Sequence, residues 1–196
     1  MREPENTTHY SVVDPAGNAV AVTTTLNETF GSRVTAEGLG FLLNDEMDDF
    51  TAKQGAPNAY GLIQGPANAI GPGKRPLSAM SPTMVLKDGK LFLVLGSPGG
   101  PTIISTVANV LMGVVDFGMD IQEAVNAPRF HHQWLPDEIR AEDRISPDTL
   151  VILRAKGHKF KMEHLWGDGE CIEVDPKTSE RLGASDGRNN GKAVGF

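Results

Sequence analysis

Strands are predicted near both ends of this sequence and helices between them, and this order constrains the fold more than any other feature. Two β-hairpins are predicted because alternating apolar residues flank clear turn residues. Their strands are residues 10–14 and 19–25, around PAGN, and residues 83–86 and 91–95, around KDGK. Further strands are predicted at residues 160–165, 170–174 and 181–184. Because helices and strands do not alternate as in βαβ units, we expect an α+β layered sandwich with largely antiparallel sheets.

Helices are predicted in the middle of the chain. One starts near Pro101, directly after the glycine turn SPGG, and shows apolar residues at helical spacing. A short helix is predicted over residues 121–126, before a proline. A later helix is expected to have Ser146 as its N-cap and Gly157 as its C-cap.

The segment between the two hairpins is rich in loop-forming residues. A short apolar strand is expected at residues 40–43, followed by an acidic run at residues 44–49. Glycine and proline interrupt residues 51–82 throughout, which predicts a loop. A loop of this length in a compact domain is usually functional or mobile.

Composition and charge limit the partners of the chain. The 196 residues carry a net charge of −7, which argues against nucleic acid as a partner. No apolar run approaches the roughly 20 residues of a membrane helix, so no membrane span is predicted. Cys171 is the only cysteine, which excludes an internal disulfide and makes a cysteine-based metal site improbable. We expect no cofactor.

Two motifs can carry chemistry, and the residues alone leave each of them open. Gly99 and Gly100 precede a helix, where successive N–H groups can bind an anion or the oxyanion of acyl transfer; a tight turn needs glycine as well. The acidic run around Asp49 can hold a cation or a substrate ammonium group, but it does not match an EF-hand loop. A solvated acidic turn is the commoner explanation of such a run.

Histidine and threonine give weaker signals. His131 and His132 are adjacent, so their side chains point apart, and a structural role is expected for them rather than a metal site. The threonines of the first hairpin suit strands. Threonine can also be a nucleophile when a free amine lies beside its hydroxyl.

Several segments, in order and at matching spacing, resemble the small subunit of gamma-glutamyltranspeptidase. They are TTHYSVVD, GNAVAVTTTLN, LLNDEMDDF, KRPLSAMSPT, GSPGGPTII and NAPRFHHQWLPDE, and the likeness runs from about Thr7 to GASD near the C-terminus. The resemblance implies an N-terminal nucleophile hydrolase with a four-layer αββα sandwich, made as a precursor that cleaves itself before Thr7. Residues 1–6 would be the tail of a large subunit or an added leader, and residues 7–196 the small-subunit domain.

The resemblance also implies roles in catalysis. Thr7 would be the nucleophile, and its freed α-amine, with a pKa of about 7.7–8.0, would be the base. Thr25 would hydrogen-bond the Thr7 hydroxyl, and the N–H groups of Gly99 and Gly100 would form the oxyanion hole. The donor would be glutathione or glutamine, and the acceptor water, an amino acid or a peptide.

The α-amino-acid end of the γ-glutamyl donor has implied contacts too. Asn27, Glu46 and Asp49 would hold its ammonium group. Ser78 would hold its carboxylate, and Tyr60 matches a lid residue that covers the site. Many bacterial relatives have a second serine where this chain has Ala79, which puts one hydrogen bond to the donor carboxylate in doubt. Glu46 discriminates little, since relatives also carry glutamine there.

Two alternatives to this activity remain. A cephalosporin acylase uses the same scaffold with a glutaryl donor, but that donor lacks the ammonium group that the pair Glu46 and Asp49 would bind. The chain could also be a non-catalytic orphan subunit or an uncleaved fragment. By resemblance, its partner would be the large subunit of the same precursor, and its location periplasmic or secreted.

Overall fold

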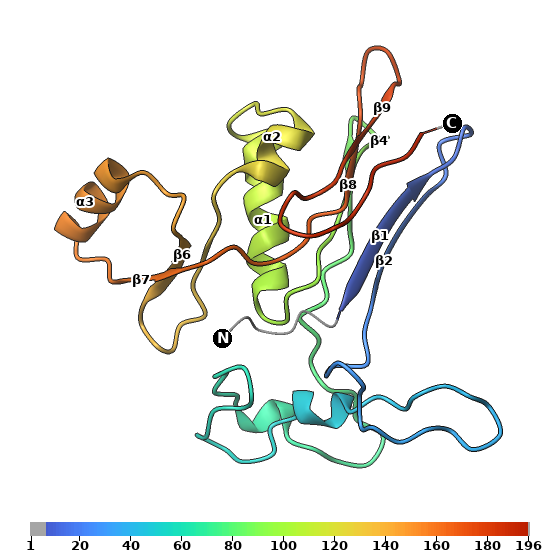
Figure 1. Ribbon diagram of the computed structural model, residues 1–196, viewed down its shortest axis with the longest axis vertical. Coiled ribbons are helices and arrows are strands. Elements are labelled where there is room, and N and C mark those ends of the chain that lie inside the picture. The colour runs from blue at the N-terminus through green and yellow to red at the C-terminus, as the bar shows by residue number, and fades with distance from the viewer. Residues whose placement is uncertain (1–6, 196) are drawn as a thin grey trace.

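The central sheet of the protein has the strand order β3–β4–β8–β9, and all of its pairs are antiparallel. A computed structural model describes residues 7–195, and Figure 1 shows how its elements are arranged. The strands are β3 (Thr83–Lys87), β4 (Lys90–Leu95), β8 (Cys171–Val174) and β9 (Arg181–Ala184). The predicted hairpin around KDGK is therefore confirmed, and so is the strand at residues 181–184.

The first hairpin lies against one face of this sheet. Its strands are β1 (Thr8–Val13) and β2 (Ala19–Thr24), which pair antiparallel; β1 packs on β8 and β2 on β4. Helices α1 (Thr102–Val115) and α2 (Ile121–Asn126) cover the other face (Figure 1). The described residues thus form a helical layer, a sheet and a second β layer.

Helix α1 buries a stripe of its surface against β4. The buried residues Ile103, Val107, Val110 and Val114 recur at helical spacing, and β4 contributes the fully buried Leu93 and Leu95. Ile104 and Val115 belong to the predicted apolar face as well, but both are more than half exposed. Each follows a buried residue directly, so it points about 100° away from the stripe.

A smaller group of elements extends from the body on the left of Figure 1. It contains β5 (Phe130–His131), β6 (Ile139–Glu142), α3 (Pro147–Ala155) and β7 (Phe160–Glu163). β6 and β7 are parallel neighbours joined through α3. The expectation of no βαβ unit is therefore wrong at this point, because a four-residue strand reading IRAE carries too little apolar pattern to be recognised.

Two local predictions also need correction. The expected strand at residues 40–43 is absent from the described structure: Leu42 forms only an isolated bridge with Thr35, and Phe41 is 53% exposed. Ser146 is the N-cap residue of α3, but its side chain makes no capping hydrogen bond. Gly157 follows the helix end with φ 94°, as expected of a glycine at this place.

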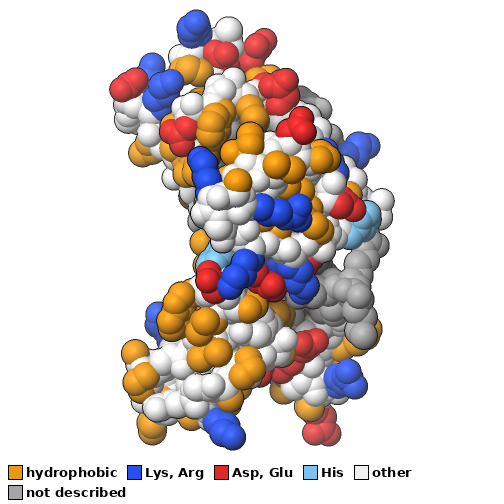
Figure 2. Space-filling view, turned by 90° about the vertical axis from the view of Figure 1, so that its left-hand side faces the viewer, with side chains coloured by type: hydrophobic (Ala, Val, Ile, Leu, Met, Phe, Trp, Pro, Cys, Tyr) orange, Lys and Arg blue, Asp and Glu red, His pale blue; other side chains and the backbone are white. Residues whose placement is uncertain are grey.

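Residues 25–82 form a lobe of loops below the sheets. Its only helical turns are η1 (Glu46–Asp49) and η2 (Pro66–Asn68), so the long predicted loop is confirmed. In Figure 2 the lobe meets the body at a narrower waist, and apolar side chains lie exposed on both parts. No helix between residues 7 and 195 is long and apolar enough to cross a membrane.

Candidate active site

A small cavity of about 40 Å³ lies where the ends of the first hairpin, the loop lobe and the start of α1 meet. Most of the predicted site residues line it: Thr7, Thr25, Asn27, Glu46, Asp49, Tyr60, Ser78 and Gly100. Gly99, directly before Gly100, is not among the lining residues. Residues 1–6 lie outside the described residues, so the predicted cleavage bond is described only on its Thr7 side.

Strand pairing brings the two candidate threonines together. Thr8 pairs with Thr24 in the β1–β2 register, so one step further places Thr7 across from Thr25. Side chains alternate along a strand, and here Thr8 is exposed whereas Thr7 is half-buried. The Thr25 hydroxyl oxygen accepts a hydrogen bond from the N–H of Asn27 at 2.9 Å, which fixes its orientation at the cavity.

The same inward face of β1 carries a buried histidine that sequence analysis did not assign. His9 Nδ1 lies 2.8 Å from Thr23 Oγ1, and Nε2 lies 3.1 Å from Ser11 Oγ. Ser11 donates its own proton to the Glu170 carbonyl, so His9 Nε2–H donates to Ser11 and Nδ1 accepts from Thr23. Burial lowers the pKa of His9 to about 4, so it is neutral at pH 7. Gly96 makes room for the ring, since a Cβ there would collide with it.

The glycine turn before α1 has a backbone conformation that only glycine adopts readily. Gly99 and Gly100 have φ of 134° and 53°, which favours glycine at both positions. The Gly99 carbonyl accepts two hydrogen bonds from Thr102, one from its N–H at 3.1 Å and one from its hydroxyl at 2.8 Å. In a trans peptide the C=O and N–H point in opposite directions. The Gly100 N–H is therefore directed away from the helix and is free of it.

Two acidic side chains of η1, Glu46 and Asp49, lie together at the cavity. Their carboxyl groups are close enough to form a hydrogen bond when one of them is protonated. Burial, then this hydrogen bond and the charge of Asp49, raise the pKa of Glu46 to about 7, and burial also raises the pKa of Asp49. A cation bound beside these two carboxyl groups would stabilise their ionised forms.

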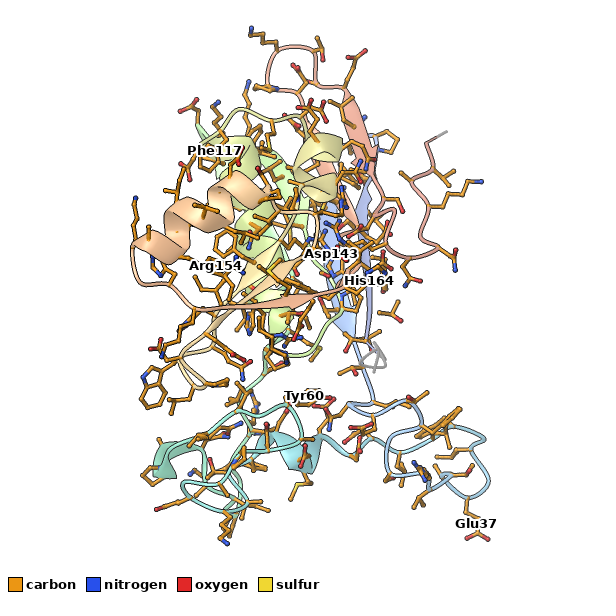
Figure 3. The ribbon with its side chains drawn as sticks, turned by 60° about the vertical axis from the view of Figure 1, so that its left-hand side comes forward. Glu37, Tyr60, Phe117, Asp143, Arg154 and His164 are labelled. Atoms are coloured by element: carbon orange, nitrogen blue, oxygen red, sulfur yellow. The ribbon has the colours of Figure 1, made fainter. Side chains whose placement is uncertain are left out.

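Tyr60 lines the cavity from the loop lobe. The Asn58 side chain accepts hydrogen bonds from the N–H groups of Tyr60 and Leu62 at 3.0 and 2.9 Å and so builds the loop tip. Burial and nearby carboxylates raise the pKa of Tyr60 to about 12 and keep its hydroxyl a donor. Figure 3 shows Tyr60 at the boundary between the lobe and the body.

Ser78 lines the same cavity. Its hydroxyl oxygen accepts a hydrogen bond from the Met80 N–H at 3.2 Å, and the next residue, Ala79, also lines the cavity but offers no hydroxyl. The site thus places one nucleophile candidate, one glycine N–H, an acidic pair and one serine around a single small space. That arrangement suits acyl transfer from a donor with an ammonium and a carboxylate group.

The comparisons decide the family. The whole chain, residues 1–196, matches the family model described as Gamma-glutamyltranspeptidase. The chain belongs to the gamma-glutamyltranspeptidase family. It is 58% identical over 187 residues to a glutathione hydrolase proenzyme of Escherichia coli strain K12, a match that covers 95% of this chain and 32% of that relative. It is 60% identical over 159 residues to a glutathione hydrolase proenzyme of Pseudomonas sp. strain A14, covering 81% of this chain and 28% of that relative.

Solved structures of the family share the fold. The crystal structure of a mutant gamma-glutamyltranspeptidase from Helicobacter pylori matches with a TM-score of 0.87 and 53% identity, covering 93% of this chain and 100% of that chain. A cephalosporin acylase from Bacillus halodurans matches with a TM-score of 0.81 and 26% identity, covering 95% of this chain and 33% of that chain. The α+β fold of the N-terminal nucleophile hydrolase type is thus confirmed. The chain spans about a third of the length of the curated relatives named above.

A network of buried ion pairs lies close to the segment that packs against the glycine turn. Arg129 pairs with Asp186 at 2.5 Å, and Arg188 pairs with Glu142 at 2.7 Å and with Asp186 at 2.9 Å. Arg129 also donates to the carbonyl of Trp166 at 2.8 Å, next to the segment that packs under the glycine turn. Sequence analysis missed this network, because its members lie far apart in the chain and no local pattern marks them.

The side chains of the two adjacent histidines point apart, as expected. His131 is buried and lies 2.8 Å from Ser105 Oγ and 3.0 Å from Gln133 Oε1, whereas His132 lies at the surface, 3.4 Å from Asp137. Within residues 7–195, no group of three histidine, cysteine, aspartate or glutamate side chains is arranged to hold a metal ion. Cys171 is a buried free thiol.

Proposed function

We propose that this segment is the small-subunit part, residues 7–196, of a proenzyme that transfers γ-glutamyl groups from glutathione or glutamine to water, an amino acid or a peptide. The observation that carries this proposal is the cavity that joins Thr7 to Gly100 and to the acidic pair Glu46 and Asp49. Membership of the family, and the names of the relatives as glutathione hydrolase proenzymes, support it.

The first step makes the base. In the precursor, the Thr7 hydroxyl attacks the carbonyl carbon of residue 6, and the acyl group moves from nitrogen to oxygen. Water then hydrolyses the ester, which releases residues 1–6 as a new C-terminus and leaves a free α-amine on Thr7. This amine titrates near pH 8, so an appreciable neutral fraction is present at pH 7 to accept the hydroxyl proton.

The second step uses this amine in acyl transfer. The Thr7 hydroxyl attacks the γ-carbonyl of the donor while the amine takes its proton. The N–H groups of Gly99 and Gly100 stabilise the oxyanion, and the proton passes to the leaving amine. Water or an acceptor amine then attacks the ester, and its proton returns through the α-amine of Thr7. Thr25 orients the nucleophile in both halves of the reaction.

Specificity comes from the α-amino-acid end of the donor. Its ammonium group donates to the carboxylates of Glu46 and Asp49 and to the amide oxygen of Asn27, and its carboxylate accepts from the Ser78 hydroxyl. A half-buried acidic pair left without a cation is unfavourable, so a glutaryl donor is disfavoured. This argues against the activity of the cephalosporin acylase, which is also the more distant match at 26% identity.

The partner is the large subunit of the same precursor. Exposed apolar side chains on the outer side of β1 and β2, Tyr10, Val12 and Val20, offer it a surface, and the missing helical layer of the sandwich would come from it. We also propose a periplasmic or secreted location, which cell fractionation tests directly.

The decisive experiment replaces Thr7 in the full-length precursor. Thr7→Ala is expected to leave the precursor uncleaved by gel and intact mass, and to abolish release of nitroaniline from γ-glutamyl-p-nitroanilide. The matched control is Thr8→Ala, which removes the neighbouring, outward-facing hydroxyl and should retain both reactions. Continued γ-glutamyl release by the Thr7→Ala protein would reject the proposal, and an inert wild type of correct mass would favour the non-catalytic alternative.

A further inference from the structure

Asn68 links the two turns that flank the donor cavity. Its Nδ2 donates a hydrogen bond to the Asp49 carbonyl at 2.7 Å, and its Oδ1 accepts one from the Leu77 N–H at 3.0 Å. The same Nδ2 contacts Gln64 Oε1, at the base of the lid loop. One planar amide thus links the turn at Asp49, the segment at Leu77 and the nearby side chain of Gln64.

Each end of this amide reaches the backbone beside a substrate contact. Asp49 carries a carboxylate of the acidic pair, and Leu77 directly precedes Ser78. In the proposed function, these two residues hold the ammonium and the carboxylate of the donor, which sit on one and the same carbon atom. The separation of the two turns must therefore match a fixed, short distance, and an amide with both ends engaged sets that separation.

The backbone of Asn68 is itself fixed by two hydrogen bonds. The Asn68 carbonyl accepts from the Thr51 N–H at 3.0 Å, and its N–H donates to the Gly65 carbonyl, within the turn η2. Asn68 is not among the residues that line the cavity, so it acts through its neighbours and does not touch the donor.

We propose that Asn68 is a positioning residue for the donor subsite, which sets the spacing between the acidic turn at Asp49 and Ser78. This inference rests on the proposed function, because it takes those two residues as contacts of a γ-glutamyl group. It concerns donor binding and leaves the Thr7 chemistry alone.

The test uses the full-length precursor with Asn68→Ala and Asn68→Asp. The aspartate keeps an oxygen for the Leu77 N–H but loses the donor to Asp49, and it serves as the second variant if the alanine protein does not accumulate. Both variants should still cleave before Thr7. The KM for γ-glutamyl-p-nitroanilide and the inhibition constant of free L-glutamate are expected to rise together, about 10-fold, since a hydrogen bond that orients a charged contact is lost. The kcat should stay within about twofold.

Lys74→Met is the matched control. Lys74 ties down the same turn, through the carbonyls of Ala67 at 3.0 Å and Ala69 at 2.8 Å, but it contacts neither Asp49 nor Leu77 in the described hydrogen bonds. Its KM and glutamate inhibition constant should equal those of the wild type. A merely structural role of Asn68 would lower the active fraction, and hence kcat, with KM unchanged.

The outcomes separate the two proposals. Asn68 variants with lower kcat and unchanged KM, or a Lys74→Met protein with the same rise in KM, would overturn the inference about Asn68 while the function stands. A wild-type protein that cleaves itself but does not turn over the γ-glutamyl anilide would overturn the proposed function instead.

Discussion

The hydroxyl of Tyr60 donates a hydrogen bond to Oδ1 of Asn27 over 3.1 Å. This contact joins the tip of the lid loop to the chain just after β2. The amide nitrogen of Asn27 in turn lies 3.4 Å from the carbonyl of Asp45, so the Asn27 side chain lies between the lid and the acidic turn. The Tyr60 hydroxyl therefore ties the tip of this loop to Asn27, and both residues line the cavity.

Tyr60→Phe should weaken closure of the lid. The change keeps the ring and removes one neutral hydrogen bond, whose net value is about 0.5–1.5 kcal/mol. We expect KM for a γ-glutamyl donor to rise about 2- to 10-fold, measured by steady-state anilide release. The control is Tyr10→Phe, an exposed tyrosine on the outer side of β1. An unchanged KM in the Tyr60 variant would mean that the bond contributes nothing to donor binding.

Thr102→Val should misalign the oxyanion hole. Valine has the shape of threonine but cannot donate to the Gly99 carbonyl, so the Gly99–Gly100 peptide loses one of its two anchors. Removing an oxyanion donor costs about 10²–10³ in rate, and misalignment should cost part of this, about 10-fold in kcat with KM unchanged. Thr102→Ser keeps the hydroxyl and should restore the rate. Equal rates for the two variants would contradict this role.

Donor binding should depend on pH through Glu46. Its raised pKa, about 7, means that the carboxyl is protonated below pH 7 and ionised above it. An ammonium donor gains from the ionised form, so kcat/KM should rise with pH through about 7. In Glu46→Gln this rise should disappear and leave only the titration of the Thr7 amine near pH 8. A pH profile of kcat/KM identical to that of the wild type would show that Glu46 does not contact the donor.

Glu142→Gln should destabilise the fold. Glu142 is fully buried and accepts from Arg188 and from the N–H of Arg129. Removing one partner leaves buried arginine charge uncompensated, at a cost of about 3–5 kcal/mol. Urea unfolding of the processed protein measures this loss. Lys159→Met, an exposed position just before β7, should change the free energy of unfolding by less than about 0.5 kcal/mol. A similar loss in both variants would show that the network adds nothing beyond a surface charge.

Local signals predicted the elements that depend on local interactions. Helix α2 occupies residues 121–126 as expected, and Asp120 and Glu123 form a capping box at its start. The hairpin around KDGK depends on its turn, where Asp88 and Gly89 both have positive φ. Such features are encoded within a few residues, so the sequence alone is sufficient for them.

Local sequence patterns do not predict which strands pair when the strands are far apart in the chain. β6 and β7 pair in parallel, with α3 between them in the chain. The four residues of β6, IRAE, show no apolar pattern that would predict this pairing. The apolar run at residues 40–43 shows the opposite error: apolar composition predicted a strand where Phe41 is exposed. For the cavity, residue types alone left every motif open. Family resemblance supplied the grouping of Thr7, Gly100 and Asp49, and the structure places these three around one space.

The buried network has a consequence for how the chain is made. Arg129 and Glu142 leave the ribosome well before Asp186 and Arg188, the residues that neutralise them. Because burying an unpaired charge is costly, we expect the interior around residues 129–142 to stay hydrated until residues 186 and 188 are available to pair with it. This ion-pair network can therefore form only after residue 188 has left the ribosome.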